Sequence, residues 1–381
     1  MSRIAIVHDY FTQRGGAERV AEQLYAMFPD ADVYSTVALP EMLPDNIPVE
    51  KIRTSWMQSL PKMAKYHRYY FAVYPFGVKS LNLEDYDVVI TSSSGYAKGV
   101  HTRPDAFHIC YCHTPMRWVW RYDDYAEREN FGTGARAVLP AVLKALRAWD
   151  SNAARQPDQF IANSSVVAQR IESIYGRHAV VIPPPIDVNR FHISPDQEDY
   201  FLVLSRLVPY KRIDLAVNAC NLLGRTLKVI GNGPDRKRLE EIAGPTIQFL
   251  GRLPDEEIQQ HVSRCQALLF TGEEDFGMVP LEVASAGRPT IAFRGGGATE
   301  TIVNGVTGLF FDKPEVASLV AALEEFPRHE WFPSVLRNHA EQFDIQVFQQ
   351  HFLQLLMGLG IELPASRFAT SQTPFHQPSA S

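Results

Sequence analysis

Two glutamates flank a turn that could bind an anion. Glu274 lies in a loop after an expected strand at 267–270, and Glu282 lies in the helix that follows, expected at 280–286. The free amides around residues 277–279 could receive an anion at the start of this helix. A carboxylate beside them can accept hydrogen bonds from sugar hydroxyls or stabilise developing positive charge. Alternatively, Glu282 merely complements the helix dipole.

Two cations occupy a corresponding position earlier in the chain. Arg206 ends an expected strand at 200–205, and Lys211 precedes Arg212 at the start of the next helix. Cations at a helix N-terminus oppose its dipole unless an anion lies between them. We therefore expect Arg206 and Lys211 to be exposed in an empty cleft and to hold a diphosphate there. The alternative is a pair of solvated surface charges.

Short β-branched runs alternate with longer helical patterns along the chain, which is typical of parallel α/β units. In the first half we expect strands at 3–8, 87–91, 107–111 and 159–162, and helices at 18–27 and 166–175. In the second half we expect strands at 200–205, 226–230, 247–250, 267–270 and 290–293, and helices from 212 and at 236–242, 255–263 and 280–286. These halves predict two Rossmann-like sheets that face each other across a cleft.

Three consecutive prolines at 183–185 mark the boundary between the halves, because they cannot lie inside a central strand or helix. We predict an N-terminal domain at 1–182 and a C-terminal domain at 183–344. A last helical stretch, at 345–362, is expected to return to the N-terminal domain. The tail at 363–381 contains no acidic residue and is expected to be disordered.

The composition is that of a globular protein: 381 residues, 45% hydrophobic and 21% charged, with a net charge of −6. This balance argues against nucleic-acid binding through a general basic field. We interpret the four cysteines, Cys110 and Cys112 among them, as buried free thiols in a reducing cytosol. There is no signal-peptide pattern and no apolar stretch of roughly 18 residues. We therefore expect a protein that is cytoplasmic or peripheral to a membrane.

Paired aspartates are not expected to form a metal site. The two D-x-D pairs, Asp30 with Asp32 and Asp85 with Asp87, stand before expected strands. That is the wrong end of a parallel sheet for the cleft. We therefore expect no divalent metal, and we expect the two cations described above to neutralise a leaving diphosphate instead.

A glycine pair offers a rival interpretation. Gly231 and Gly233 follow a strand and could begin a G-x-G-x-x-G dinucleotide fingerprint. The third glycine position is occupied by Arg236, and no such pattern follows the first strand. A nicotinamide or flavin enzyme is therefore a weak alternative.

The stretch at 51–83 contains no acidic residue, although the whole chain is net negative. Its cations alternate with aromatic residues, among them Trp56, Tyr66, Tyr69, Tyr70, Phe71, Tyr74 and Phe76. Basic residues beside aromatic ones suit an anionic membrane surface, and Lys62, Lys65 and Arg68 are our candidates for contact with a membrane or an acceptor. The alternative is a core-packed helix with a solvated basic edge.

The spacing of Glu274 and Glu282 resembles the E-x7-E signature of the retaining glycosyltransferases of family 4. Matching segments extend over about residues 3–310 and include Gly15-Gly16-Ala17-Glu18, His113-Thr114-Pro115-Met116-Arg117, Ser205 to Lys211, Gly231 to Pro234, Phe276-Gly277 and Gly295 to Glu300. The segment that begins with His113 is most similar to bacterial O-antigen and exopolysaccharide mannosyltransferases.

The resemblance implies the GT-B fold, with a nucleotide sugar held mainly by the C-terminal domain and an acceptor held by the N-terminal one. It implies that Arg206 and Lys211 bind the diphosphate, that Glu274 contacts the donor sugar and that Glu282 contacts the ribose. His113 would reach the donor sugar and complete the catalytic set. Judged without the resemblance, His113 is better explained as a structural histidine.

Further donor contacts are implied for the first glycine loop and for several turns of the C-terminal domain: Gly15, Gly16, Gly231, Arg252, Leu253, Phe276, Gly277, Met278 and Val279. The contacts at 276–279 are expected to use backbone amides. Asn163 and Ser164 follow a strand and could line the cleft, although a helix cap explains Ser164 as well.

These expectations combine into one functional hypothesis. The chain is expected to move a hexose, mannose from GDP-mannose, onto a glycan or a polyprenyl-diphosphate-linked glycan, in bacterial surface polysaccharide synthesis and without a metal or other cofactor. Retention at the anomeric carbon is implied by the resemblance alone. The alternatives are a UDP-sugar-dependent enzyme of the same fold and a non-catalytic sugar-nucleotide-binding protein.

Overall fold

The computed structural model describes residues 2–121 and 133–362, without the side chains of residues 133–138. In this part of the chain, the first sheet has seven parallel strands in the order β3-β2-β1-β4-β5-β6-β7. The strands are β1 (Ile4–His8), β2 (Asp32–Ser35), β3 (Ile52–Thr54), β4 (Val88–Ser93), β5 (Phe107–Cys112), β6 (Gln159–Ala162) and β7 (Ala179–Val181). The helices of this half are α1 (Gly16–Met27), α2 (Met63–Tyr66), α3 (Tyr74–Lys79), α4 (Arg117–Trp120), α6 (Thr133–Ala153) and α7 (Ser165–Tyr175).

The second sheet has six parallel strands in the order β10-β9-β8-β11-β12-β13 within the described residues. The strands are β8 (Phe201–Leu204), β9 (Leu227–Ile230), β10 (Ile247–Gly251), β11 (Ala267–Phe270), β12 (Thr290–Phe293) and β13 (Gly308–Phe311). The helices are α8 (Ile213–Leu223), α9 (Arg236–Glu241), α10 (Asp255–Arg264), α11 (Met278–Ser285), α12 (Ala298–Thr301), α13 (Val316–Glu325) and α14 (Pro333–Glu341). Short 3-10 helices lie at Pro40–Met42, Val49–Lys51, Trp56–Ser59, His67–Tyr70, Ala97–Gly99, Val188–Arg190, Pro209–Lys211 and Phe326–Arg328.

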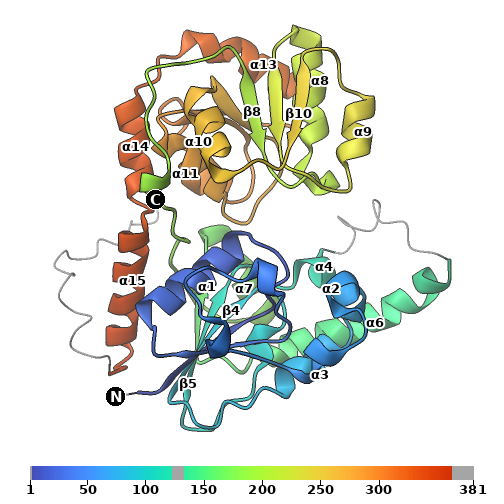
Figure 1. The fold of residues 1–381 in the computed structure, drawn as a ribbon, viewed down its shortest axis with the longest axis vertical. Coiled ribbons are helices and arrows are strands. Elements are labelled where there is room, and N and C mark those ends of the chain that lie inside the picture. The colour runs from blue at the N-terminus through green and yellow to red at the C-terminus, as the bar shows by residue number, and fades with distance from the viewer. Residues whose placement is uncertain (1, 122–132, 363–381) are drawn as a thin grey trace.

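Two α/β sheets of parallel strands confirm the predicted fold class, and the two halves lie one above the other in Figure 1. Both faces of the first sheet are buried, because successive residues of β1 point into different cores: Ile6 into one, Ala5 and Val7 into the other. The cysteines of β5 are buried free thiols as predicted. Sequence patterns missed the strands β2, β3, β7 and β13 and the helices α6, α13 and α14. Two of the missed strands, β3 and β7, have only three residues each, too short for a clear periodicity.

The chain passes between the two halves twice, and the two passages lie side by side. The Ile186 amide donates to the Phe343 carbonyl at 3.0 Å, and the Ile345 amide donates to the Ile186 carbonyl at 3.2 Å. Helix α15 (Ile345–Gly358) then packs Phe348, Phe352 and Leu356 into the core of the first sheet. Figure 1 shows α15 running down beside that half. None of the helices in the described residues is long and apolar enough to cross a membrane. The predicted disordered tail, 363–381, lies outside the described residues.

Candidate active site

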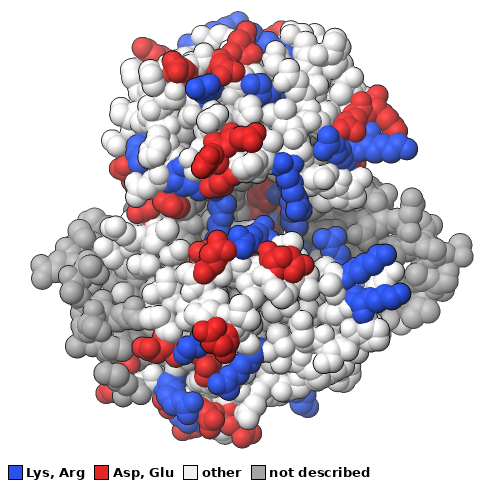
Figure 2. Space-filling model, viewed as in Figure 1, with Lys and Arg blue, Asp and Glu red and all other residues white. Residues whose placement is uncertain are grey.

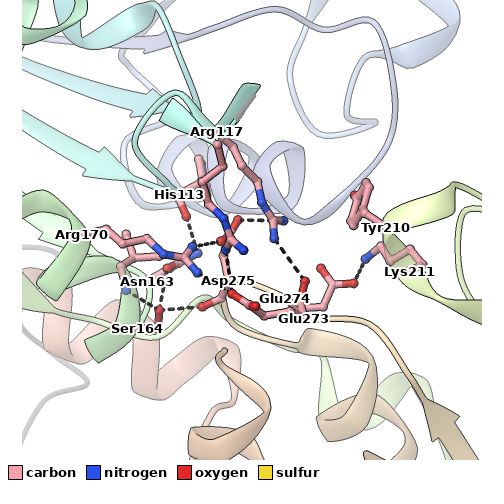
Figure 3. A network of polar contacts seen from close by, with 12 residues as sticks. His113, Arg117, Asn163, Ser164, Arg170, Tyr210, Lys211, Glu273, Glu274 and Asp275 are labelled. Atoms are coloured by element: carbon pink, nitrogen blue, oxygen red, sulfur yellow. Dashed lines mark hydrogen bonds and ion pairs between the residues drawn. The ribbon is translucent and has the colours of Figure 1, made fainter. Parts of the chain in front are cut away.

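The loop between β11 and α11 carries three consecutive acids, Glu273, Glu274 and Asp275, at the carboxyl end of the second sheet. In an open α/β sheet this is the edge where ligands bind. Figure 3 shows this loop facing Arg117 of α4 and Arg170 of α7, while Glu274 points toward Lys211. Figure 2 shows Lys and Arg side chains in the hollow between the two halves.

Lys211 forms an ion pair with Glu274, so these two expected site residues do meet. Gly272 makes the approach possible, because a Cβ there would lie 2.7 Å from the Lys211 Cα. The expectation that Lys211 is exposed was wrong: only 15% of its side chain is accessible. Burial, and then the charges of Arg206 and Arg117, lower the pKa of Lys211 to about 7, and the charge of Asp275 opposes this shift.

Arg206 is exposed, as expected, and it reaches the other half of the molecule. Its guanidinium donates to Gln13 Oε1 at 2.9 Å and to Tyr210 Oη at 3.3 Å. The turn at Gly231 packs against the strand end that carries Arg206, since a Cβ on Gly231 would lie 1.9 Å from the Ser205 carbonyl oxygen. Its φ of +133° also favours glycine. The glycine pair therefore has a packing reason that is independent of a dinucleotide.

Glu282 is buried and accepts hydrogen bonds from two arginines that the sequence patterns did not single out. Arg190 Nη1 lies 3.1 Å from Glu282 Oε1, and Arg19 of α1 contacts the same oxygen from the first half. The helix-dipole explanation of Glu282 is wrong, because α11 begins at Met278 and has no acidic residue in its first turn. Glu282 is thus part of a contact between the two halves.

The start of α11 has the geometry of an anion site. Gly277 precedes the helix with a φ of +95°, and the amides of Gly277, Met278 and Val279 donate no backbone hydrogen bond to another described residue. Gly16 faces this turn from the first half, where a Cβ would lie 2.8 Å from the Met278 sulfur. The Phe276 side chain is buried in an apolar core, so only its backbone is available to a ligand.

His113 lies directly after β5 and is buried, with 8% of its surface accessible. Its Nε2 lies 2.8 Å from Ser92 Oγ, and its carbonyl accepts a hydrogen bond from Asn163 Nδ2 at 2.9 Å. The ring also packs against Tyr111, with 5.1 Å between centroids. Burial, and then the charge of His8, lower the pKa of His113 to about 3. The ring is therefore neutral near pH 7.

Three arginines of the first half meet the acidic loop. Arg121 Nη1 lies 2.7 Å and Arg170 Nη2 lies 2.9 Å from Glu273 Oε1, and Arg170 also contacts Asp275. Arg117 donates to the Glu273 carbonyl at 3.3 Å. Of these three arginines, only Arg117 belongs to a segment that resembles the family in the sequence analysis. No sequence pattern indicates that Arg121 or Arg170 contacts this loop.

The N-terminus of α7 is a second contact between the halves. Ser164 is the expected helix cap, because its hydroxyl accepts from the Val167 amide, and the same hydroxyl donates to the Asp275 carbonyl of the other half at 2.6 Å. Glu300 of the second half accepts from the Ser165 amide at 2.9 Å. A carboxylate is favourable at this position because it complements the helix dipole.

The other expected residues lie at the margins of this site. Arg252 is exposed after β10, and Leu253 is half-buried in an apolar cluster. Gly15 precedes α1, where a Cβ would lie 3.0 Å from Glu18 Oε2. Lys62, Lys65 and Arg68 are exposed in and beside α2, on the right of Figure 1.

The aspartate pairs lie at the amino ends of strands, as expected. Asp32 opens β2 and contacts Arg53 at 3.3 Å, while Asp87 precedes β4 and contacts Arg103. Both carboxylates therefore have partners away from the loop at 273–275.

Comparison with known proteins identifies both halves. Residues 14–190 match the family model described as Glycosyltransferase Family 4, and residues 187–343 match the model described as Glycosyl transferases group 1. A GDP-mannose-dependent alpha-(1-6)-phosphatidylinositol monomannoside mannosyltransferase of Mycolicibacterium smegmatis is 29% identical over 219 residues, which cover 49% of this chain and 56% of the relative. A glycogen synthase of Mycobacterium tuberculosis is 28% identical over 205 residues, 49% of each protein. The aligned part is thus about half the length of these curated relatives.

Solved structures share the fold at low sequence identity. Anabaena HepE in complex with UDP is 20% identical, with a TM-score of 0.69, and the match covers 93% of this chain and 100% of that one. The galactosyltransferase WaaB of the lipopolysaccharide outer core is 18% identical, with a TM-score of 0.65 over 94% of this chain and 99% of that one. Since the two family models together match residues 14–343, the chain belongs to the glycosyltransferases that combine a Family 4 N-terminal half with a group 1 C-terminal half.

Proposed function

We propose that this protein transfers a hexose from a nucleoside-diphosphate sugar to a glycan acceptor, with mannose from GDP-mannose as the donor. One observation carries the proposal: Arg206, Lys211 and Glu274 converge beside the unpaired amides of α11, in the hollow between the two halves. Two cations and a helix N-terminus suit a diphosphate, and a carboxylate suits sugar hydroxyls.

A bound diphosphate would change the partners of Lys211. The phosphate charge would take the place of Glu274 beside the ammonium group and keep it protonated, although burial lowers its pKa to about 7. Glu274 would then be free to accept hydrogen bonds from the sugar. Arg206 and Lys211 would stabilise the charge that develops on the leaving nucleotide, so no metal ion is needed for that role.

For retention, the acceptor hydroxyl would approach the anomeric carbon from the face that the diphosphate leaves. No side chain then has to act as a nucleophile, and we assign none. His113, neutral because its pKa is about 3, and Glu274 would orient the sugar, which lowers the barrier by positioning.

The proposed nucleotide base of the donor rests on the names and ligands of similar proteins. A mannosyltransferase whose name specifies GDP-mannose supports GDP, whereas the HepE structures with UDP and with UDP-glucose favour a UDP-sugar as the second candidate. A thermal-shift series with GDP, UDP and ADP separates them, because a ligand that binds only the folded state raises its stability as RT ln(1 + [L]/Kd). We expect GDP to give the largest shift. A larger shift with UDP would reverse the donor assignment.

Product analysis separates an enzyme from a binding protein. With GDP-mannose and a lipid-linked glycan acceptor, we expect release of GDP together with a product heavier by one hexose. Binding of GDP without any product, tested over a panel of acceptors, would favour the non-catalytic alternative.

For the acceptor we propose a glycan on a polyprenyl diphosphate, in bacterial surface polysaccharide synthesis at the inner face of the plasma membrane. The support is the basic segment, in which Lys62, Lys65 and Arg68 are exposed next to Tyr69 and Phe76, 75% and 67% exposed. Tyr74 and Val78 of the same segment are buried in the core, so the core-packed alternative describes its inner side only.

Vesicles of stated composition test this docking surface. Wild-type protein should bind vesicles with 30% phosphatidylglycerol, and ~1 M salt should weaken the binding because the Debye length falls to about 3 Å. Replacing Lys62, Lys65 and Arg68 with Glu should reduce binding further and leave GDP binding intact. The matched control places Glu at three cations of the other half, Lys237, Arg264 and Lys313. Equal loss in both triple variants would remove the segment from the proposal.

A further inference from the structure

Four polar side chains form a buried chain at the carboxyl ends of β1, β4 and β5. His8 and Ser92 are direct partners in the parallel ladder, and His113 follows the neighbouring strand. Ser92 Oγ lies 3.0 Å from His8 Nδ1 and 2.8 Å from His113 Nε2. On the other side, His8 Nε2 lies 3.8 Å from Glu18 Oε1. We call these four residues the Glu18–His113 chain.

The hydroxyl of Ser92 links the two imidazole rings. It has one proton, so it can donate a hydrogen bond to one ring nitrogen while it accepts a hydrogen bond from the other. If His8 Nδ1 carries a proton, Ser92 accepts from it and donates to His113 Nε2. If His8 Nδ1 is bare, Ser92 donates to His8 and accepts from a proton on His113 Nε2. The state of His8 therefore decides which nitrogen of His113 carries the proton.

The environment of Glu18 decides the state of His8. Glu18 is only 4% exposed, and its Oε2 has no hydrogen-bond partner within the described residues. A buried carboxylate requires a compensating charge, and in the described part of the chain His8 is the group at ion-pair distance from Glu18. Burial favours zero net charge for this pair, which places one proton between Glu18 and His8 Nε2 and the other on His8 Nδ1, where it donates to Ser92.

We propose that Glu18, His8 and Ser92 are positioning residues that hold His113 in the tautomer with its proton on Nδ1. In this tautomer Ser92 donates to Nε2, and His113 presents a hydrogen-bond donor through Nδ1, a nitrogen that has no hydrogen-bond partner among the described residues. That Nδ1 donates to an oxygen of the donor sugar rests on the proposed function. The tautomer itself does not depend on it.

The tautomer can be read directly by nitrogen NMR. In protein labelled with ¹⁵N-histidine, the His113 signals are assigned by their loss in His113→Gln. We expect a protonated Nδ1 and a bare Nε2 in the wild type, without any ligand present. A wild-type spectrum with the proton on Nε2 would overturn the proposal, whatever the variants do.

Glu18→Gln tests the direction of the hydrogen bonds in the Glu18–His113 chain, because it removes the negative charge and retains the shape of the side chain. The pair then loses one proton, and the single proton of His8 should lie on Nε2, facing the new amide oxygen. Ser92 should turn toward His8, and the proton of His113 should move to Nε2. An unchanged His113 tautomer in this variant would show that Glu18 does not act on it.

A matched pair of variants on β4 separates positioning from stability. Ser92→Ala interrupts the hydrogen bonds of the Glu18–His113 chain. Thr91→Val removes a buried hydroxyl that lies 3.1 Å from the Nε2 of a different histidine, His108. Both should lose stability. Only Ser92→Ala should give mixed tautomers of His113 and lower kcat about 10-fold, the factor for one hydrogen bond, with the donor KM nearly unchanged. Equal kinetic losses in both variants would assign Ser92 a purely structural role.

If wild-type protein gives the expected tautomer but transfers no sugar, the proposed function fails and the tautomer assignment stands. If it transfers sugar but carries the proton of His113 on Nε2, the proposed function stands and the tautomer assignment fails. The two ideas are therefore tested separately.

Discussion

Two expected site residues, Lys211 of the C-terminal half and His113 of the N-terminal half, are held in opposite ways. The C-terminal half contributes charged side chains whose partners can be exchanged: Lys211 pairs with Glu274, and Glu282 pairs with arginines of both halves. The N-terminal half contributes a neutral His113, held by burial and by Ser92. Groups of the first kind can move their interactions to an incoming ligand, whereas groups of the second kind must be in place before it arrives.

The same contrast appears in two lysines. Lys98 of the N-terminal half is 1% exposed and lies 2.5 Å from Asp150, which also accepts from Trp120 and Tyr175. Although burial opposes its charge, Asp150 raises the pKa of Lys98. The pKa of Lys211 is instead lowered to about 7 by burial and by its neighbouring cations. The charge of Lys98 is therefore compensated within the folded protein, whereas Lys211 would be stabilised in its charged form by an additional anion.

The largest effect we predict distinguishes these two lysines by stability. Lys98→Met leaves Asp150 as an uncompensated buried charge, and the free energy of unfolding should fall by about 3–5 kcal/mol. The loss in Lys211→Met should be smaller, because 20% of the Glu274 side chain is accessible to water, whereas none of the Asp150 side chain is. Urea unfolding measures both. Similar losses in the two variants would remove the contrast.

The second prediction makes the complementary comparison by activity. Arg206→Ala and Lys211→Ala should each reduce kcat about 100-fold, roughly 3 kcal/mol of transition-state stabilisation, because a cation beside the developing diphosphate charge is lost. Lys237→Ala, at a lysine whose side chain is 90% exposed, is the matched control and should keep its activity. A double variant of Arg206 and Lys211 with near wild-type turnover would refute the diphosphate assignment.

The third prediction concerns pH and the buried neutral histidines. Burial lowers the pKa of His108 and His113 to about 3, compared with about 6.5 in an unfolded chain. Between these values the unfolded chain binds more protons, so the free energy of unfolding falls as the pH is lowered from 6.5 toward 3, and is unaffected above that window. At pH 5 each histidine should account for on the order of 2 kcal/mol.

Urea unfolding at pH 7.5 and at pH 5 measures this fall. His108→Asn, which cannot take up the proton, should reduce it. If the variant shows the full fall, His108 does not resist protonation in the folded protein.

The smallest predicted effect is no effect. If the cations of the C-terminal half replace a metal, EDTA should leave the transfer rate within about 10% of its value, since Arg206 and Lys211 already supply the positive charge at the leaving group. The rate is measured with and without added Mn²⁺. Activity that EDTA abolishes and Mn²⁺ restores would mean that a metal, and not this pair, neutralises the diphosphate.

Local sequence patterns were sufficient for the two-sheet architecture and for much of the C-terminal site. Alternating strands and helices repeat every few tens of residues, so each βα unit is visible within a short window. Lys211 and Glu274 were found because each lies in the segment between a strand and the next helix, and the carboxyl ends of parallel strands come together at one edge. The cap at Ser164 was found because a helix cap is a contact between residues that are close in the sequence.

Only the tertiary structure decided which distant residues become partners. Arg190 with Glu282, Arg170 with Glu273 and Ser92 with His113 are separated by 92, 103 and 21 positions. No local periodicity records such pairs, because they depend on how the strands are ordered in each sheet and how the two halves meet. The sequence also did not indicate which charged residues are buried. A single lysine is normally expected on the surface, whereas Lys211 is largely buried because the chain at Gly272 packs closely against it, next to Glu274.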